Sequence, residues 1–153
     1  MDQYLTKGIT EFEQQSYPLA LDYLRLSQST SLQYYYYFGL ACYYNRYYLE
    51  AIGALYQLND NKAVKEPLIE CFLRLNDLDN IVKLYKLRHI DDYINGLTLL
   101  FRSVKYRIFD VIKSLLKYGA NPYKICDSLF KSPLNYAMIY NDIEIIEIMM
   151  FKK

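Results

Sequence analysis

The 153-residue sequence has few of the residues on which β-rich folds depend, with 5 glycines, 4 prolines and no tryptophan. Barrels and sandwiches use glycine and proline at every hairpin turn, so this scarcity argues against both. No apolar run approaches the roughly 20 residues that a helix needs to cross a bilayer. The first residues also lack the basic and apolar segments of a signal peptide. We therefore expect a cytoplasmic protein with no membrane partner.

Histidine and cysteine are equally scarce. The chain has one histidine, His89, and three cysteines, Cys42, Cys71 and Cys126, which are far apart and form no Cys-x-x-Cys pair. One histidine cannot build a multi-histidine metal site, and separated cysteines favour reduced thiols over a disulfide framework. No residues show the pattern of a catalytic site, so we expect no enzymatic activity, no cofactor and no metal. Cys42 and Cys71 occupy small-residue packing positions and should be buried, whereas Cys126, in a long loop, should be more reactive.

The charges nearly cancel, with 18 Lys and Arg against 17 Asp and Glu and a net charge of +1. This balance does not favour nucleic acid or an anionic membrane as a general partner. What the chain has in excess is tyrosine, with 19 residues beside 7 phenylalanines.

Helical segments recur in the second half of the chain. Thr98-Leu99-Leu100 returns as Ser132-Pro133-Leu134, and an earlier copy begins at Lys65-Glu66-Pro67-Leu68. The segment Ser132-Pro133-Leu134-Asn135-Tyr136-Ala137, together with Gly119-Ala120-Asn121, resembles the ankyrin repeat, a turn followed by two antiparallel helices. This resemblance covers about residues 65–153. The hydroxyls of Thr98 and Ser132 can cap the first helices, and Pro133 fits a first helical position. Gly119 can end a helix in a left-handed conformation.

The first third of the chain shows another recurrence. Gly8, Tyr17 and Ala20 return, with their spacing unchanged, as Gly39, Tyr48 and Ala51. This pattern resembles the tetratricopeptide repeat, in which small residues let two helices cross closely. Degenerate ankyrin-like hairpins are the alternative for this part. The tetratricopeptide resemblance implies a groove lined by Leu5, Ile9, Phe12, Tyr36, Leu40, Tyr43 and Tyr44.

Together the patterns predict an all-α fold, a solenoid of antiparallel helical hairpins in one continuous domain, 1–153. It should be tetratricopeptide-like over 1–62 and ankyrin-like over 63–153. The expected helices cover 2–14, 17–28, 31–45, 48–58, 67–75, 78–88, 99–106, 109–118, 133–140 and 143–151.

The tyrosines gather between residues 34 and 48, with eight in this stretch. A helical period of 3.6 residues cannot hide them all on one face, so some must face solvent. Tyrosine is enriched in interface hot spots, so Phe12, Tyr36, Tyr43 and Tyr44 are candidate partner-binding residues. The alternative is bulky core packing, with an AT-rich genome favouring tyrosine codons.

The ankyrin resemblance implies a second set of binding residues, at the turn tips and on the exposed faces of the first helices. They are Tyr93, Ile94, Asn95, Asp127, Ser128, Leu129 and Phe130 in the turns, and Arg102, Lys105, Tyr106, Asn135, Tyr136 and Ile139 on the helices. Leu129 and Phe130 are apolar where a turn tip is usually polar. They either contact a partner or fold back against the first helices.

These features favour a non-enzymatic module or scaffold that binds a protein or peptide partner on its concave face. The alternative is a nucleic-acid-binding adaptor that uses a basic face formed by Lys105, Arg107, Lys113, Lys117 and Lys124. A solvated helix surface also explains these five residues. Proteins of this composition with ankyrin-like repeats are often found in large DNA viruses and intracellular bacteria, so a host-directed protein in the host cytoplasm fits.

The last expected helix carries a heavy apolar load at Ile145, Ile148, Met149 and Met150. The outer face of a terminal repeat is normally polar. We therefore expect either a homodimer through this repeat or further repeats in a longer chain.

Overall fold

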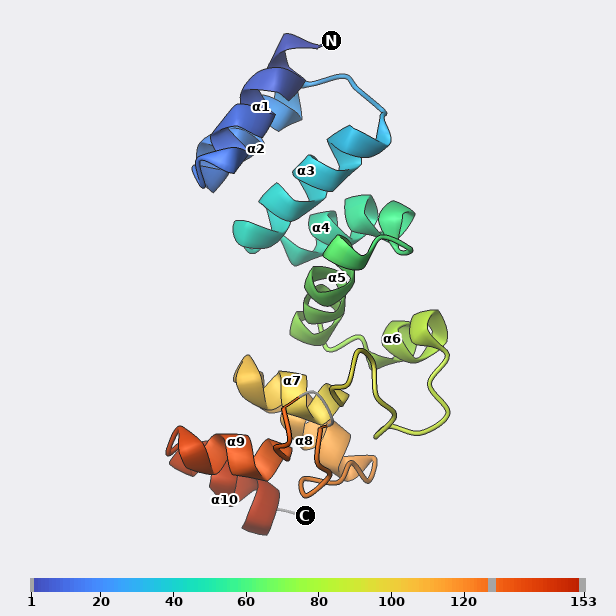
Figure 1. Ribbon diagram of the computed structural model, residues 1–153, viewed down its shortest axis with the longest axis vertical. Coiled ribbons are helices and arrows are strands. Elements are labelled where there is room, and N and C mark those ends of the chain that lie inside the picture. The colour runs from blue at the N-terminus through green and yellow to red at the C-terminus, as the bar shows by residue number, and fades with distance from the viewer. Residues whose placement is uncertain (1, 127–128, 152–153) are drawn as a thin grey trace. The chain divides into compact units, whose positions relative to one another are not determined.

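The computed structural model describes residues 2–126 and 129–151, and within them it contains helices and no β-strand (Figure 1). The all-α prediction is therefore confirmed. The helices are α1 (Gln3–Glu13), α2 (Tyr17–Leu26), α3 (Leu32–Tyr44), α4 (Tyr48–Leu55), the 3₁₀ helix η1 (Tyr56–Leu58), α5 (Lys62–Arg74), α6 (Leu78–Tyr85), α7 (Leu99–Lys105), α8 (Phe109–Lys117), α9 (Pro133–Ile139) and α10 (Ile143–Phe151).

Contacts divide the chain into two compact units, Met1–Leu75 with α1 to α5 and Asn76–Lys153 with α6 to α10. Helices that follow one another in sequence mostly pack together, as α1 does on α2 and α7 on α8, and in the second unit α7 also packs on α9. The expected change of repeat type near residue 62 and the single continuous domain stay predictions. Among the described residues, every helix is too short or too polar to cross a membrane.

The largest departure from the expected helix bounds is at α5. The ankyrin resemblance places Pro67 at the start of a helix, but α5 begins earlier, at Lys62, and Pro67 lies inside it. The cap is Asn61, whose side chain accepts a hydrogen bond from the Ala63 N–H at 2.8 Å. This cap starts the helix ahead of the proline, so the expected start at residue 67 is wrong.

Four helix pairs, two in each unit, turn through the same short connection. Its middle residue is left-handed, with φ between 53° and 66°, at Gln15, Arg46, Arg107 and Asn141. The next residue donates its N–H to a carbonyl in the last turn of the first helix, as Ser16 does to Glu11 at 2.9 Å and Tyr47 to Cys42 at 2.8 Å. This pattern is a Schellman motif, which satisfies carbonyls at the end of the first helix and reverses the chain.

Glycines allow the close helix crossings of the first unit. A Cβ added at Gly8 would lie 2.6 Å from Leu24 Cγ, and one added at Gly39 would lie 2.5 Å from Leu55 Cδ2. Both leucines are fully buried. The interval from Gly8 to Gly39 equals that from Leu24 to Leu55, so the α1–α2 and α3–α4 pairs are packed in the same way.

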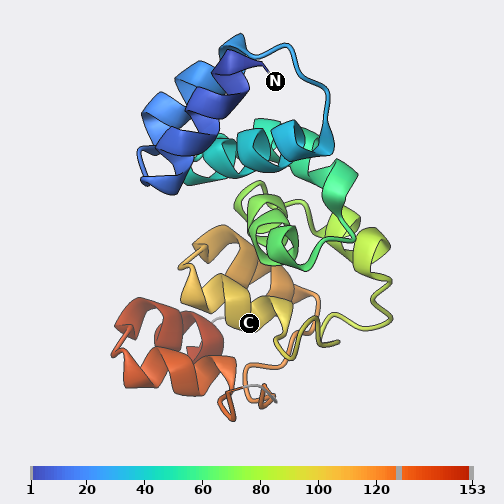
Figure 2. The ribbon, with the colours of Figure 1, turned by 45° about the horizontal axis from the view of Figure 1, so that its top comes forward.

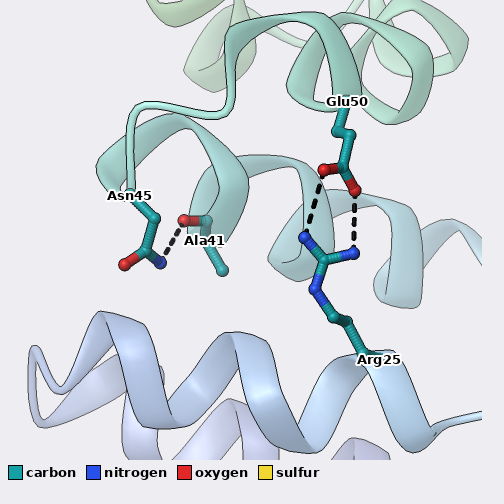
Figure 3. A network of polar contacts seen from close by, with 4 residues as sticks. All are labelled: Arg25, Ala41, Asn45 and Glu50. Carbon is teal, nitrogen blue, oxygen red and sulfur yellow. Dashed lines mark hydrogen bonds and ion pairs between the residues drawn. The ribbon is translucent and has the colours of Figure 1, made fainter.

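Polar contacts tie these two hairpins together (Figure 3). The Arg25 guanidinium on α2 donates to both carboxylate oxygens of Glu50 on α4, at 2.8 and 3.1 Å. The side-chain amide of Asn45, at the end of α3, donates to the carbonyls of Ala41 at 2.7 Å and Tyr17 at 3.0 Å. The paired charges fix α2 against α4, and Asn45 links the end of α3 to the start of α2.

The second unit shows the caps that the sequence predicts. Thr98 Oγ1 accepts the Phe101 N–H at 3.1 Å, and Ser132 Oγ accepts the Asn135 N–H at 3.0 Å. Pro133 is at the first position of α9, and Gly119 follows α8 with φ of +92°. The α7–α8 and α9–α10 pairs therefore begin and turn at matching positions.

Candidate partner-binding site

Six aromatic rings of the first unit form one connected group, called here the aromatic cluster: Phe12, Tyr17, Tyr36, Tyr37, Tyr43 and Tyr44. Phe12 meets Tyr37 edge-on with centroids 5.3 Å apart, and Tyr17 stacks on Tyr44 at 4.2 Å. All four aromatic residues that the tetratricopeptide resemblance implies belong to this group. Their rings come from α1, the start of α2 and α3, so three helices build one surface.

The aromatic cluster is only partly buried. Tyr44 is 48% exposed, and the other five members are half-buried. Burial raises the pKa of Tyr44 and of Tyr37 above the ordinary tyrosine value, so both phenols are neutral donors at physiological pH. Leu5 and Leu40, which share the implied groove, are buried and serve packing. The structure therefore separates a leucine core from a ring surface that retains contact with solvent.

A polar pocket of about 260 Å³ adjoins the cluster, lined by Tyr43, Tyr44, Arg46, Tyr48, Glu70 and Arg74. Glu70 on α5 is 7% exposed and accepts a hydrogen bond from Tyr43 Oη at 2.6 Å. Arg74, one turn later, donates to the other Glu70 oxygen at 3.2 Å, and its guanidinium lies 5.9 Å from the Tyr48 ring. A buried carboxylate needs such partners, so Tyr43 is fixed in orientation by α5.

Arg102 is a correction to the expected site. The resemblance implies that it lies on an exposed helix face, but it is 1% exposed. Its guanidinium donates to the carbonyls of Leu97 at 2.9 Å and Ile94 at 2.5 Å. The turn before α7 folds over this position, and the arginine satisfies the turn's carbonyls instead of reaching a partner. Ile94, expected at the same tip, is also buried, whereas Asn95 is exposed.

The other turn residues lie in two loops that contact each other. Tyr93 Oη donates to the Ile125 carbonyl, and Lys124 Nζ lies 4.4 Å from the Tyr93 ring and donates to the Asp91 carbonyl at 2.6 Å. Leu129 is 43% and Phe130 84% exposed, so neither side chain is buried against the first helices. Asp127 and Ser128 lie outside the described residues.

The remaining expected residues lie at or near a second hollow, the C-terminal groove, of about 590 Å³. Lys105 and Tyr136 line it, and Tyr136 also packs edge-on against Phe101 at 5.1 Å. Tyr106 is the C-terminal cap residue of α7, and the Lys105 ammonium lies 5.9 Å from the centre of its ring. Asn135 is exposed, and its side chain takes part in the capping box of Ser132 at the start of α9. Ile139 is exposed. The groove is lined by Val104, Lys105, Arg107, Tyr136, Ala137, Tyr140, Asn141, Asp142, Ile143 and Glu144.

Two of the basic residues of the expected nucleic-acid face are engaged by neighbouring side chains and carbonyls, and three are exposed. Arg107 pairs with Asp142 at 2.7 Å, and Lys124 is engaged by Asp91 and Tyr93. Lys105, Lys113 and Lys117 are exposed. Nucleic-acid binding through this face stays a prediction.

The three thiols are all buried, Cys42 and Cys71 as expected. Burial raises the pKa of each of these two to about 12, which makes them inert at neutral pH. Cys126 is also fully buried, with its sulfur 3.9 Å from Thr98 Oγ1, so the expectation of a more reactive thiol is wrong. Within the described part of the chain, no three His, Cys, Asp or Glu residues are grouped in a way that could hold a metal ion.

Some residues of the aromatic cluster and of the polar pocket are not among the binding residues that the sequence predicts. Tyr17 and Tyr48 recur at matching positions of the glycine and alanine pattern, which is a usable signal. Glu70 stands alone as a charge in the apolar run 67–73, which is itself a signal that a polar partner is needed. Arg46 and Arg74 carry no such mark, because their place beside the pocket depends on how α5 packs on α3.

Taken together, the structure defines an all-α protein of mostly sequentially packed helices with a partly exposed aromatic surface. Comparisons of the chain with models of protein families, with curated proteins and with solved structures find no match.

Proposed function

We propose that this protein is a non-enzymatic interaction module that binds a segment of a partner protein on the aromatic cluster of its first unit. The observation that carries the proposal is the cluster itself, six connected rings from three helices that stay partly exposed. These rings therefore offer aromatic surface that packing within the first unit leaves uncovered. Tyrosine gives a large contact area with few rotatable bonds, which is why it dominates interface hot spots.

The polar pocket supports the same function. Hot spots work best where anchoring rings are held rigidly, because less conformational entropy is lost on binding. Tyr43 is held by Glu70, and Tyr44 is held by stacking on Tyr17. The pocket beside them offers phenol and guanidinium donors to the polar groups of a peptide.

The proposal includes a helical-repeat architecture for the whole chain. It is supported by the shared turn of four hairpins, the matching contacts of Gly8 and Gly39, and the matching caps of Thr98 and Ser132. A cytoplasmic setting inside a host cell fits the composition and the buried thiols.

A displayed peptide library tests the function directly. Full-length protein is used to select peptides, and the affinity of each peptide is then measured for the wild type, Tyr44→Ala, Tyr36→Ala and the control Tyr118→Ala. Tyr118 is also an exposed tyrosine, at 70%, but it belongs to the second unit and lies outside the aromatic cluster, so it controls for the loss of an exposed tyrosine as such. We expect the two cluster variants to weaken binding about tenfold or more, as loss of a hot-spot tyrosine does.

Circular dichroism of each variant separates lost binding from lost fold. An equal loss of affinity in Tyr118→Ala, or unchanged affinity in folded Tyr36→Ala and Tyr44→Ala, would contradict the proposal.

A further inference from the structure

The polar pocket of the first unit lies where α5 packs against α3. Figure 2 shows α5, in green, beside α3, in turquoise. The end of α3 and the turn after it supply three of the six lining residues, α4 supplies one and α5 supplies two. All six belong to the first unit, so the pocket is complete within it.

The charged groups of the pocket leave a positive surplus. Two arginines line it against one carboxylate, that of Glu70. Both Glu70 oxygens already accept hydrogen bonds, Oε1 from Tyr43 Oη at 2.6 Å and Oε2 from Arg74 Nε at 3.2 Å. A guanidinium donates hydrogen bonds and accepts none. Because Glu70 balances the charge of Arg74, the charge of Arg46 remains, and it favours a bound group that is negative and accepts hydrogen bonds.

Arg46 is exposed where it lines the pocket. Among the residues that the structure describes, its side chain makes no ion pair. Its backbone is fixed by the turn between α3 and α4, with φ of 66° and its N–H donating to the Tyr43 carbonyl at 3.0 Å. The turn therefore holds the start of this side chain in place, while the guanidinium is left to contact a bound molecule.

The first hairpin has a different set of residues at the equivalent positions. Gln15 takes the place of Arg46 in the same turn, with φ of 63°, and Tyr17 is the counterpart of Tyr48. The Tyr17 ring stacks on a ring of α3, whereas the Tyr48 ring lies 5.9 Å from the Arg74 guanidinium. The turn thus accepts an uncharged residue, and the two arginines are particular to the pocket.

We propose that the polar pocket binds an acidic side chain, an aspartate or a glutamate, of the partner segment that lies on the aromatic cluster, with its carboxylate on Arg46. This inference rests on the proposed function and adds the charge of the partner to it. Tyr44 lines the pocket and also belongs to the cluster, so one short segment can contact both. A contact between a carboxylate and a guanidinium is charge-assisted and stronger than a neutral hydrogen bond.

Other charges beside the cluster favour this placement. The exposed Glu13 acts on Tyr37, whose pKa is raised by burial and then by this carboxylate. An acidic residue bound next to Tyr37 would meet a like charge, so the pocket is the better place for it. Glu70 in the pocket also favours the single charge of a carboxylate over the double charge of a phosphate.

Two displayed peptide libraries test the inference. They are matched in length, and one encodes Asp and Glu where the other encodes Asn and Gln. Full-length protein should enrich peptides from the acidic library, and Arg46→Gln should weaken each acidic peptide about three- to tenfold but not its amide version. Gln15 shows that glutamine fits this turn. The control Arg88→Gln removes an exposed arginine of the second unit and should change neither affinity.

Tyr36→Ala separates this inference from the proposed function, because Tyr36 belongs to the cluster but does not line the pocket. Equal recovery from the two libraries, or an equal effect of Arg46→Gln on acidic and amide peptides, would overturn the inference. The proposed function would still hold if Tyr36→Ala weakened those peptides. Acidic peptides that depend on Arg46 but bind folded Tyr36→Ala and Tyr44→Ala unchanged would contradict the proposed function, and with it a segment shared by cluster and pocket.

Discussion

Gly8 and Gly39 are placed where a side chain has no room. An added Cβ at either position would overlap a buried leucine of the partner helix. Gly53 on α4 is also helical, but nothing lies within 4 Å of an added Cβ there. Replacing each glycine with alanine therefore distinguishes the effect of crowding on stability, at Gly8 and Gly39, from the effect of helix propensity alone, at Gly53.

We predict that Gly8→Ala and Gly39→Ala each lower the free energy of unfolding by about 1–2 kcal/mol, because overpacking outweighs the gain in helix propensity. Gly53→Ala should raise it by about 0.5–1 kcal/mol, since only the propensity gain remains. Urea denaturation followed by circular dichroism measures all three. Stabilisation by Gly8→Ala would show that the α1–α2 crossing is looser than the structure has it.

The Arg107–Asp142 pair makes stability depend on pH. The hydrogen bond from Arg107 holds the pKa of Asp142 below its ordinary value. A carboxyl with a lowered pKa in the folded state contributes stability above its ordinary pKa, and this contribution is lost as pH falls through the folded-state pKa. The pair should therefore stabilise the protein at neutral pH and cease to do so in acid.

The prediction is that Arg107→Gln destabilises the protein at pH 7 and that its difference from the wild type shrinks as pH falls below about 4. Exposed Lys113→Gln serves as the charge control and should show no such convergence. Urea denaturation across this pH range checks it. A difference that stays constant into acid would rule out Asp142 as the titrating partner.

At the scale of elements, the short turn that joins the helices of four pairs contains a non-glycine residue in the left-handed conformation, which is energetically unfavourable. Its left-handed residues are Gln15, Arg46, Arg107 and Asn141, although glycine adopts positive φ without strain. Gln15 is exposed and in the first hairpin, so it can be replaced without touching the core.

We predict that Gln15→Gly raises the free energy of unfolding by about 0.5–1 kcal/mol. The neighbouring Gln14 has φ of −87°, so Gln14→Gly should lower stability by a similar amount. Thermal unfolding of the two variants makes the comparison. Equal effects of the two changes would contradict the assigned turn.

The position of Pro67 is where the predicted helix bounds and the structure differ most, because Pro67 lies inside α5 and not at its start. A proline inside a helix removes the N–H that would bond to the carbonyl one turn earlier, here that of Ala63. Pro67→Ala should therefore stabilise the protein by about 1–2 kcal/mol, whereas Pro133→Ala, at a first helical position, should not. Denaturation of both variants decides between them. A neutral Pro67→Ala would support a helix that begins at residue 67.

Most helices could be predicted because caps, turn residues and apolar spacing agree locally. Thr98, Ser132 and Gly119 behave as their chemistry dictates. Pro67 matches the start of the ankyrin motif, but Asn61 is an equally good start signal in the sequence and is the residue that caps α5. The left-handed Arg46 and Arg107 had no signal, since the turn geometry and not the residue type selects their conformation.

At the scale of the whole molecule, the two units offer different surfaces. The first has the aromatic cluster and its polar pocket, and the second has the C-terminal groove. The sequence could place Phe12, Tyr36, Tyr43 and Tyr44 together because the recurring Gly, Tyr and Ala spacing predicts which helix residues share a face. It could not place Arg102, because burial there depends on how the 94–97 turn folds over α7.

The central claim is that the aromatic cluster is where a partner binds. Oxidative footprinting of the full chain, with and without a selected peptide, reports it most directly, because exposed tyrosine rings are modified and covered ones are not. The account predicts that Tyr44, now 48% exposed, becomes protected in the complex while Tyr118, 70% exposed, is modified as before. Protection of Tyr118 with Tyr44 unchanged would contradict it.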